Sequence, residues 1–433
     1  MKEILNKIRK KKIAICVVGL GYVGLPLCLR MIKRKIKVFG IDSDTKKIEY
    51  LKKGKSYISD IKGSELKYFK TNKSRVTTNY DIIKDCEVVI VCLPTPLRDN
   101  KPDMSYLENS YKAISKVLTK NKIIILESTV YPGATKYLTK YFSKKYVIGK
   151  DIFIGYSPER ENPGDKNFSY DKTPKIVSGI SRKCKILAKT IYKNFIKKVV
   201  LVDSVEIAEL SKLLENTYRS VNISLVNEIK IICERLNIDV HKVIEAASTK
   251  NFGYQKFVPG PGIGGHCIPI DPLYLSWVSK KHGYDPKFIR AAGEISYFIP
   301  KWIVNKITDF FKNKDLKLAR VLIIGISYKP NVGDDRESPA FDIMKYFTKK
   351  NIKYDFYDPY FNNLRIGRKN KVLLKRINLN QNNIKKYDAS IIITDHKKVD
   401  YDLIFKNSKF IFDCRARYKK IKRYSEDKKI IYC

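Results

Sequence analysis

The chain of 433 residues is 44% hydrophobic and 12% aromatic, which excludes a disordered protein and provides for two or three globular domains. Its formal net charge is +43, but the lysines are spread over the whole length rather than gathered in one arm or helix. That distribution favours a solvated surface that attracts an anionic substrate, and it argues against a specific nucleic-acid interface.

The sequence gives no sign of membrane insertion, export or metal binding. No apolar run approaches the length of a membrane span. The run at 13–20 follows several lysines, but it is short and has no small-residue cleavage site, so we interpret it as a strand rather than a signal peptide. Nine cysteines without a CxxC pair and four histidines without a ligand pair favour reduced thiols and no metal site. We expect a cytoplasmic protein.

Short apolar runs alternate with longer amphipathic stretches over the first 202 residues. Because strands that alternate with helices form βαβ units, the pattern predicts a wound parallel sheet. The predicted strands lie at 13–20, 38–41, 88–93, 123–128 and 153–156.

A dinucleotide-binding motif follows the first predicted strand. Gly19, Gly21 and Gly24 form a GxGxxG pattern that opens a helix. In this motif the first glycine permits a tight turn, the second lets a pyrophosphate reach the backbone, and the third allows close helix–strand packing. Asp42 ends the second strand, where an acid bonds the ribose 2′-OH and favours NAD over NADP. Residues 1–202 are therefore predicted to be an NAD-binding Rossmann domain.

Two further loops follow later strands of this domain. Ligands of doubly wound sheets bind outside the carboxyl ends of the strands, so hydroxyl groups in these loops are candidate cofactor or substrate contacts. Ordinary proline-containing turns are an equally good interpretation. With the residues between the glycines, the candidate cofactor contacts are Tyr22, Val23, Pro94, Thr95, Ser128 and Thr129.

Residues 203–312 are predicted to be a central helical domain. From Val205 onward, apolar residues recur at three- and four-residue steps, which describes one amphipathic helix of about thirty residues. A helix of this length usually bridges domains or pairs with a partner helix, so it is the candidate element for a homodimer. A PGPG segment interrupts the helical region, and Pro300 lies near its end.

Residues 313–433 are predicted to be a second, smaller α/β domain. Strands are expected at 321–326, 354–357, 390–394 and 410–413, with a helix at 339–347. The predicted fold class is α/β, with two Rossmann-like doubly wound domains joined by a central helical domain that contains one long helix.

The segment at 259–272 contains Cys267 in a glycine-dense turn, with Asp271 four residues later. Glycines let a backbone approach a ligand closely. A thiolate is a strong nucleophile toward carbonyl carbon. On its own, however, such a segment is more typical of a structural turn with an inert thiol.

Seven motifs occur in an order that resembles the UDP-glucose/GDP-mannose dehydrogenase family of nucleotide-sugar 6-dehydrogenases. They are GLGYVGLP, CLPTP, ESTVYPG, SPERENPGD, KLLENTYRSVNISLVNE, PGPGIGGHCIPIDP and YKPNVGDDRESPA, and the resemblance extends from about residue 13 to 418. It implies oxidation of a sugar C6 hydroxyl to a carboxylate by two NAD⁺ in succession. Cys267 would then carry a thiohemiacetal and a thioester, which a two-electron alcohol dehydrogenase does not need.

The resemblance also implies roles for other residues. Lys212 would stabilise oxyanionic intermediates and Asn216 would position the substrate. Asp271 would hold a water or act as a base, while Glu159 and Thr129 would assist thioester hydrolysis. Without the family context, Lys212 would read as an exposed lysine. His266 is interpreted as structural. Arg336 would lie near the cofactor, and the further substrate contacts would be Arg160, Lys250, Asn251, Tyr254, Phe257, Gly260, Gly264 and Lys329.

The expected substrate is a UDP-N-acetylhexosamine, with UDP-GlcNAc first and UDP-GalNAc or UDP-ManNAc next. The residues after Ser157-Pro158-Glu159 and the PGPG segment resemble that branch of the family. Asn251, beside Lys250, stands where the glucose branch tends to place an arginine contributed across the dimer. UDP-glucose remains the alternative, and the product would feed surface polysaccharide or glycan synthesis.

Overall fold

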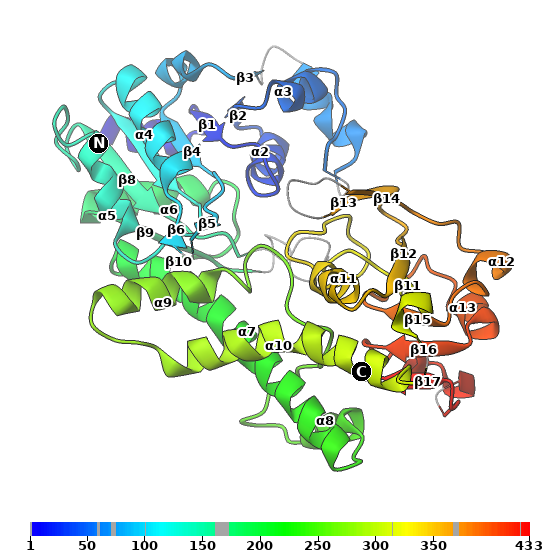
Figure 1. The fold of residues 1–433 in the computed structure, drawn as a ribbon. Helices are drawn as coiled ribbons and strands as arrows, with labels where there is room; N and C mark the ends of the chain where they lie inside the picture. The colour runs from blue at the N-terminus through cyan, green and yellow to red at the C-terminus, as the bar shows by residue number, and fades with distance from the viewer. Residues whose placement is uncertain are drawn as a thin grey trace. The chain divides into compact units, whose positions relative to one another are not determined.

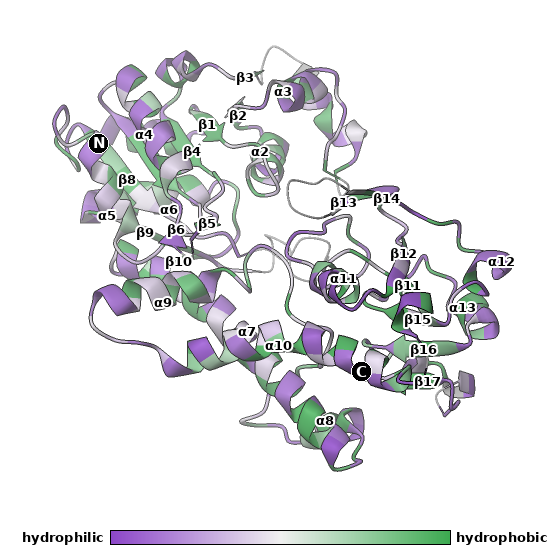
Figure 2. Ribbon diagram, in the orientation of Figure 1, coloured by the Kyte–Doolittle hydropathy of each residue, from purple (hydrophilic) through white to green (hydrophobic). Residues whose placement is uncertain are grey.

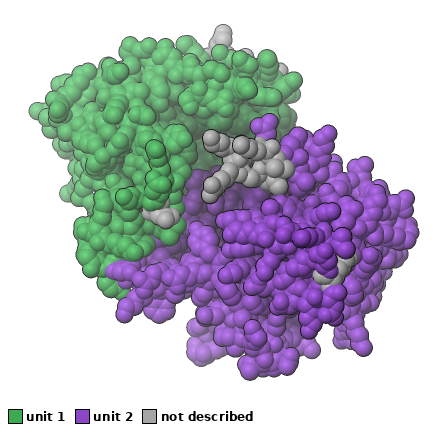
Figure 3. Space-filling view, viewed as in Figure 1, with its two compact units in different colours: residues 1–215, 273–284 green, residues 216–272, 285–433 purple. Residues whose placement is uncertain are grey.

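The computed structural model describes residues 2–58, 61–70, 75–99, 101–160, 173–313, 315–366, 372–424 and 426–433. By its internal contacts the chain divides into two compact units, coloured separately in Figure 3. The N-terminal unit comprises Met1–Glu215 and Leu273–Tyr284, and the C-terminal unit comprises Asn216–Pro272 and Asp285–Cys433. The three-domain division at residues 202 and 312 stays a prediction.

An eight-stranded sheet forms the core of the N-terminal unit, with the order β10-β9-β8-β7-β4-β1-β2-β3 (Figure 1). Every neighbouring pair is parallel except β8 and β9, which are antiparallel. The strands are β1 (Ala14–Val18), β2 (Lys37–Ile41), β3 (Val76–Thr77), β4 (Val88–Val91), β7 (Lys122–Leu126), β8 (Ile152–Tyr156), β9 (Lys175–Gly179) and β10 (Val199–Leu201), and a separate pair is formed by β5 (Leu97–Arg98) and β6 (Lys101–Pro102).

Helices cover both faces of this sheet. Ile15 and Val17 of β1 belong to one hydrophobic cluster, and the alternate residues Cys16 and Val18 belong to another, because successive strand side chains point to opposite faces. The strands are consequently apolar on both sides. Figure 2 shows hydrophobic residues along β1 and β4. The helices are α1 (Lys2–Arg9), α2 (Gly24–Lys33), α3 (Thr45–Lys52), α4 (Ser105–Val117), α5 (Ala134–Leu138) and α6 (Arg182–Tyr192).

The predicted long helix is α7 (Val205–Arg235), which has 31 residues and takes part in both units. It is followed by α8 (Val240–Ala247), α9 (Asp271–Lys281) and α10 (Lys287–Phe310). Pro300 lies inside α10, and the helix continues for another ten residues to Phe310. None of the described helices combines the length and apolar character needed to span a membrane.

The C-terminal unit contains a five-stranded parallel sheet with the order β12-β11-β15-β16-β17. Its strands are β11 (Arg320–Ile324), β12 (Lys353–Tyr357), β15 (Ala389–Ile392), β16 (Phe410–Asp413) and β17 (Ile430–Tyr432), and β13 (Asn363–Ile366) pairs with β14 (Val372–Lys375) apart from it. Its helices are α11 (Pro339–Lys349), α12 (Gln381–Ile384) and α13 (Tyr401–Asn407). The predicted fold class is confirmed, since each sheet is wound in the Rossmann manner and a helical region lies between them in the chain.

Candidate active site

The loop between β1 and α2 has the geometry that the GxGxxG pattern predicts. Gly19 has a φ of 93°, in the left-handed region where an L side chain is strained. A Cβ at Gly24 would overlap the carbonyl oxygen of Gly19, so close packing requires that glycine. At Gly21 a Cβ would meet nothing within 4 Å. The backbone there is open to a ligand at the N-terminus of α2, which suits a dinucleotide pyrophosphate.

Asp42 lies directly after β2, where the ribose of a dinucleotide would be bound. Its Oδ2 accepts a hydrogen bond of 2.9 Å from the backbone N–H of Leu20, which fixes the carboxylate beside the glycine loop. The Nζ of Lys47 lies 3.3 Å from the same oxygen. The acid is therefore oriented by the protein, and its place fits the 2′-OH of an NAD ribose.

The loops that follow β4 and β7 are bound to each other. Ser128 Oγ accepts a 2.9 Å hydrogen bond from the N–H of Leu93, and Thr95 Oγ1 donates to the carbonyl oxygen of Thr129 at 2.7 Å. The Tyr274 hydroxyl donates to the carbonyl oxygen of Thr95. The Thr95 and Ser128 hydroxyls thus hold the two loops together, and contact between either of them and the cofactor stays a prediction, as it does for Pro94, Tyr22 and Val23.

Glu209 on α7 holds the second of these loops, and the sequence did not single it out. Its carboxylate accepts hydrogen bonds from the N–H of Gly133 at 2.6 Å and from the N–H and Oγ1 of Thr135 at 2.8 and 2.6 Å. Burial raises the pKa of Glu209 to about 7, against the lowering effect of these donors. No local pattern in the sequence marks Glu209, because its partners lie 74 and 76 positions away in the chain.

Glu159, just after β8, takes part in a buried group of charges. Lys175 Nζ lies 2.6 Å from Glu127 Oε2 and 3.4 Å from Glu159 Oε2. Tyr192 donates its hydroxyl proton to Glu127. Burial opposes the charged form of Lys175, but the two carboxylates outweigh it and raise the pKa of the lysine. Glu159 is thereby placed beside a fixed cation, although the sequence pointed to Glu159 alone.

Arg160 is also engaged with the protein. Its guanidinium forms two contacts with the Glu215 carboxylate, at 2.7 and 3.2 Å, and donates to the carbonyl oxygen of Pro174 at 2.7 Å. Its contact with substrate stays a prediction. The remainder of the SPERENPGD motif, from Glu161 onward, lies outside the described residues.

Lys212 and Asn216 lie one turn apart on the buried side of α7. Lys212 is only 8% exposed, so it is not the solvated helix lysine that composition alone would suggest. Among the described residues no carboxylate forms an ion pair with it. Asn216 donates through Nδ2 to Asp271 Oδ2 at 2.5 Å, which joins two of the predicted catalytic residues.

Cys267 is exposed, whereas the other eight cysteines are buried. Its carbonyl oxygen accepts hydrogen bonds from the N–H groups of Ile270 and Asp271, at 3.2 and 2.9 Å, in the turn that leads into α9. The Asp271 side chain is 3% exposed and is the acceptor for Asn216. Cys267, Asp271 and Asn216 are therefore brought together within the C-terminal unit.

The glycines before Cys267 pack against protein. Gly265 donates its N–H to the carbonyl oxygen of Arg336 at 3.0 Å, and a Cβ there would lie 2.8 Å from the Tyr328 ring. A Cβ at Gly264 would lie 2.8 Å from the carbonyl oxygen of Glu337. The glycines are thus required for close approach to the loop that follows β11. Contact between Gly264 and a substrate stays a prediction.

Gly260 is held by two residues of α7 that sequence reasoning missed. Asn227 Oδ1 accepts a hydrogen bond from its N–H at 2.9 Å, and Lys230 donates through Nζ to its carbonyl oxygen at 3.1 Å. Burial lowers the pKa of Lys230 to about 8. Both backbone groups of Gly260 therefore have protein partners, and its contact with substrate stays a prediction.

The remaining predicted residues lie on loops of the C-terminal unit. Arg336 forms an ion pair of 2.6 Å with Asp334. Lys329, in the same loop, is half-buried, and His266 is half-buried beside Cys267. The side chains of Lys250, Asn251 and Tyr254 are exposed, and the Phe257 ring packs against Tyr218 at a centroid distance of 6.1 Å.

The chain is similar to known proteins over most of its length. The chain matches three models of the UDP-glucose/GDP-mannose dehydrogenase family: the NAD binding domain over residues 13–196, the central domain over 206–297 and the UDP binding domain over 322–420. A UDP-N-acetyl-D-glucosamine 6-dehydrogenase of Pseudomonas aeruginosa is 36% identical over 359 residues, which cover 81% of this chain and 83% of that protein.

Two further relatives carry a different substrate in their names. A UDP-N-acetyl-D-mannosamine dehydrogenase of Methanococcus vannielii is 32% identical over 425 residues, which cover 95% of each chain. The structure of a UDP-D-ManNAc dehydrogenase from Pyrococcus horikoshii superposes with a TM-score of 0.83 and 29% identity, covering 93% of this chain and 95% of that one.

Proposed function

The chain belongs to the UDP-glucose/GDP-mannose dehydrogenase family of NAD-dependent oxidoreductases, and we propose on that premise that it oxidises C6 of a UDP-N-acetylhexosamine to the uronic acid. The observation that carries the proposal is the exposed Cys267, in the turn that precedes α9 and beside the Asn216–Asp271 pair. NAD⁺, when bound, accepts one hydride from C6 in each of two oxidation steps.

Cys267 holds the substrate between these two steps. The thiolate adds to the C6 aldehyde, and the proton that the thiol gave up passes to the new oxygen to give a thiohemiacetal. This adduct becomes a thioester when it loses a hydride from C6 and the proton of its hydroxyl group, which passes to Asp271 or to a water that Asp271 holds. Water then breaks the C–S bond, so that the carboxylate leaves and the thiol is regenerated.

Lys212 stabilises negative charge on the C6 oxygen. A buried ammonium without a carboxylate partner among the described residues is suited to an oxyanion, since no ion pair has to be broken first. Asn216, held by Asp271, positions the hydroxymethyl group. Both side chains come from the same buried side of α7, so the helix fixes their spacing.

Glu159 and Thr129 serve the hydrolysis of the thioester. Glu159 takes a proton from the attacking water, and the Thr129 hydroxyl orients that water. Lys175 keeps Glu159 in place through the buried group it forms with Glu127. The residues that hold NAD are Gly19, Gly21, Gly24 and Asp42, with Arg336 close to the cofactor.

The first substrate we propose is UDP-GlcNAc, followed by its epimers UDP-ManNAc and UDP-GalNAc. Relatives named for GlcNAc and for ManNAc have similar sequence identities to this chain, 36% and 32%, which supports a substrate of the N-acetylhexosamine class. UDP-glucose is the alternative within the family. The acetamido group distinguishes the UDP-N-acetylhexosamines from UDP-glucose. UDP-ManNAc and UDP-GalNAc each differ from UDP-GlcNAc only in the orientation of one substituent.

A panel of UDP-sugars tests this assignment. We expect kcat/KM with UDP-GlcNAc to exceed that with UDP-glucose by at least about a hundredfold, because a site built around a polar substituent penalises a substrate that lacks it. Formation of NADH is the readout, with each sugar supplied in turn to the same enzyme preparation. Equal or better turnover of UDP-glucose would overturn the substrate class, and a lack of NADH with every UDP-sugar would overturn the activity.

We also propose that the enzyme is a homodimer paired through α7. One side of this helix presents a stripe of exposed apolar side chains at three-, four- and seven-residue steps: Ile207, Leu210, Leu214, Tyr218, Leu225 and Ile232. Leu214 is 61% exposed, and such a continuous stripe on a 31-residue helix fits the equivalent stripe of a second copy.

Charge placed on this stripe tests the dimer. The Leu214→Asp and Leu225→Asp substitutions should convert the protein to a monomer in sedimentation or light-scattering measurements, since an unpaired carboxylate in an apolar interface is costly. Arg219 is exposed on the same helix but lies off the stripe, so Arg219→Ala is the control. If both variants remain dimeric, the dimer interface does not lie on this stripe of α7.

A further inference from the structure

The first turn of the C-terminal sheet repeats the geometry of the NAD-binding turn. Gly325 follows β11 with a φ of 88°, as Gly19 follows β1 with a φ of 93°. Asp358 ends the second strand, β12, and its Oδ2 accepts a hydrogen bond from the N–H of Ile326 at 2.6 Å. Asp42 makes the same contact with the residue after Gly19. By position, Asp358 is therefore the counterpart of the ribose-binding acid.

Asp358 differs from Asp42 in that it is sealed inside the protein. Its side chain is 0% exposed, and Oδ2 also accepts from the N–H of Ser327 at 3.1 Å and contacts His396 Nε2 at 3.0 Å. Its Oδ1 accepts from the N–H of Tyr360 at 2.8 Å. No ribose can reach this carboxylate without displacing His396, so the acid serves another purpose here.

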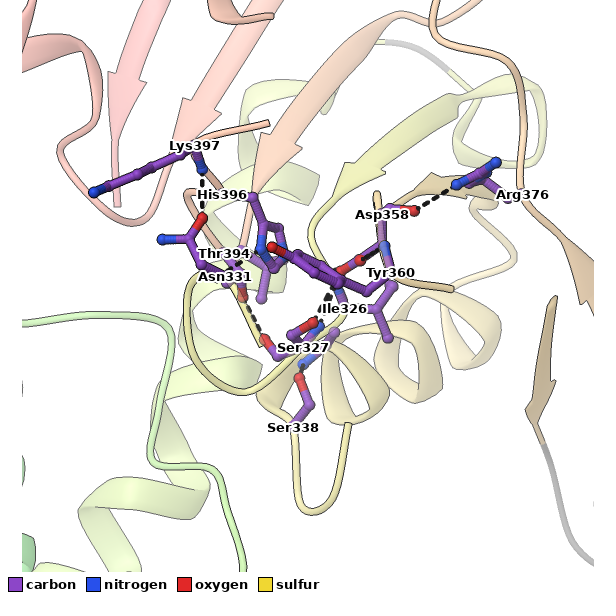
Figure 4. Close-up of polar contacts among 12 residues, drawn as sticks. Ile326, Ser327, Asn331, Ser338, Asp358, Tyr360, Arg376, Thr394, His396 and Lys397 are labelled. Carbon is purple, nitrogen blue, oxygen red and sulfur yellow. Dashed lines mark hydrogen bonds and ion pairs between the residues drawn. The ribbon is translucent and has the colours of Figure 1, made fainter. Parts of the chain in front are cut away.

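His396, just after β15, links Asp358 to the loop that contains Lys329 (Figure 4). Its Nδ1 accepts a hydrogen bond of 2.9 Å from the backbone N–H of Asn331. A backbone N–H can only donate, so Nδ1 has no proton and Nε2 donates to Asp358. The two ring nitrogens therefore have different partners on different loops.

Asn331 is the point where the loop is fixed. Its φ of 64° is left-handed, a conformation that asparagine tolerates better than most residues. Its Oδ1 accepts from the N–H of Lys397 at 2.8 Å, and nearby Thr394 donates through Oγ1 to the carbonyl oxygen of Ser327 at 2.6 Å. The loop is thus bonded on both sides of Lys329 to the residues that follow β15.

We propose that His396 is a positioning residue for substrate binding: supported by Asp358, it holds Asn331 and so places Lys329 against the UDP-sugar. This inference rests on the proposed function, in which Lys329 contacts the substrate. The same loop accepts a hydrogen bond from the N–H of Gly265 through the carbonyl oxygen of Arg336, and its Tyr328 ring packs closely against that glycine. The position of the loop consequently also affects the turn that contains the nucleophile.

Three substitutions at one position separate the two bonds of His396. In His396→Asn, the amide oxygen can replace Nδ1 as the acceptor for Asn331. In His396→Gln, the longer amide can replace Nε2 as the donor to Asp358 but cannot accept from Asn331. His396→Ala removes both. His282→Ala, at an exposed histidine, is the control.

The measurements are the KM for UDP-GlcNAc, the KM for NAD⁺, the Kd for UDP by calorimetry and the melting temperature, all on the full-length enzyme. For His396→Ala and His396→Gln we expect the sugar KM and the UDP Kd to rise about tenfold, while the NAD⁺ KM changes little. The loss of one buried hydrogen bond lowers binding affinity by about tenfold. His396→Asn should restore most of the affinity.

The outcomes also separate this inference from the proposed function. If the wild-type enzyme turns over UDP-GlcNAc and the Asn and Gln variants have equal affinity for UDP, the positioning role is wrong. A fall in melting temperature without any change in UDP affinity overturns it too. If the wild-type enzyme forms no NADH with any UDP-sugar, the proposed function fails first.

Discussion

Replacement of Cys267 by serine should abolish uronate formation and lower kcat by at least about a thousandfold, because an alcohol is a far weaker nucleophile toward an aldehyde than a thiolate. The substitution replaces only the sulfur atom by oxygen, and the side chain is exposed, so the fold should be unaffected. Near-normal production of the uronic acid by this variant would remove the thioester from the mechanism.

Thiol labelling provides an independent check on the same residue. Cys267 is the exposed cysteine, and the other eight are buried, so iodoacetamide should modify one thiol in the native enzyme. Mass spectrometry should locate the label at Cys267, with loss of activity in proportion. A saturating UDP-sugar should protect the thiol, and the Cys267→Ser variant should take up no label under the same conditions.

The second large effect is expected at Lys212. Replacement by methionine keeps the length of the side chain but removes the charge, and we expect kcat to fall by about a hundredfold to a thousandfold, as for the loss of an oxyanion-stabilising donor. The sugar KM should change much less, since the charge develops on C6 oxygen only as the reaction proceeds.

A matched substitution shows whether the loss is specific. Arg219→Met removes a cation from the same helix at an exposed position and should leave kcat unchanged. An equal loss in both variants would mean that overall charge, and not Lys212, supports turnover. A rise in KM with an unchanged kcat in Lys212→Met would assign the lysine to ground-state binding instead.

Local patterns were sufficient to predict the main elements of the fold. The buried strands β1, β4 and β7 are short apolar runs, and α7 has a continuous 3.6-residue period over 31 residues. Gly19 and Gly24 have roles that depend only on their neighbours in the chain and on the strand beside them. The antiparallel β9 was not predicted, because its direction depends on a partner strand rather than on its own residues.

The polar residues that support the site could not be found from the sequence. Lys175, Glu209, Lys230 and His396 are single polar residues, and each is bonded to a residue at least 16 positions away. In a chain with 87 lysines and arginines, a buried lysine has no local mark that distinguishes it from a solvated one. Gly260 and Gly264 were predicted to contact the substrate because they lie near the nucleophile. In the structure both glycines pack against other parts of the protein, a role that the sequence does not distinguish from close approach to a ligand.

The stoichiometry of the reaction distinguishes a four-electron from a two-electron oxidation. With limiting UDP-GlcNAc and excess NAD⁺, we expect two NADH and one UDP-N-acetylhexosaminuronate for each sugar consumed, without an aldehyde that a carbonyl reagent can trap. One NADH per sugar, with the aldehyde released, would contradict the thioester mechanism and the role of Cys267.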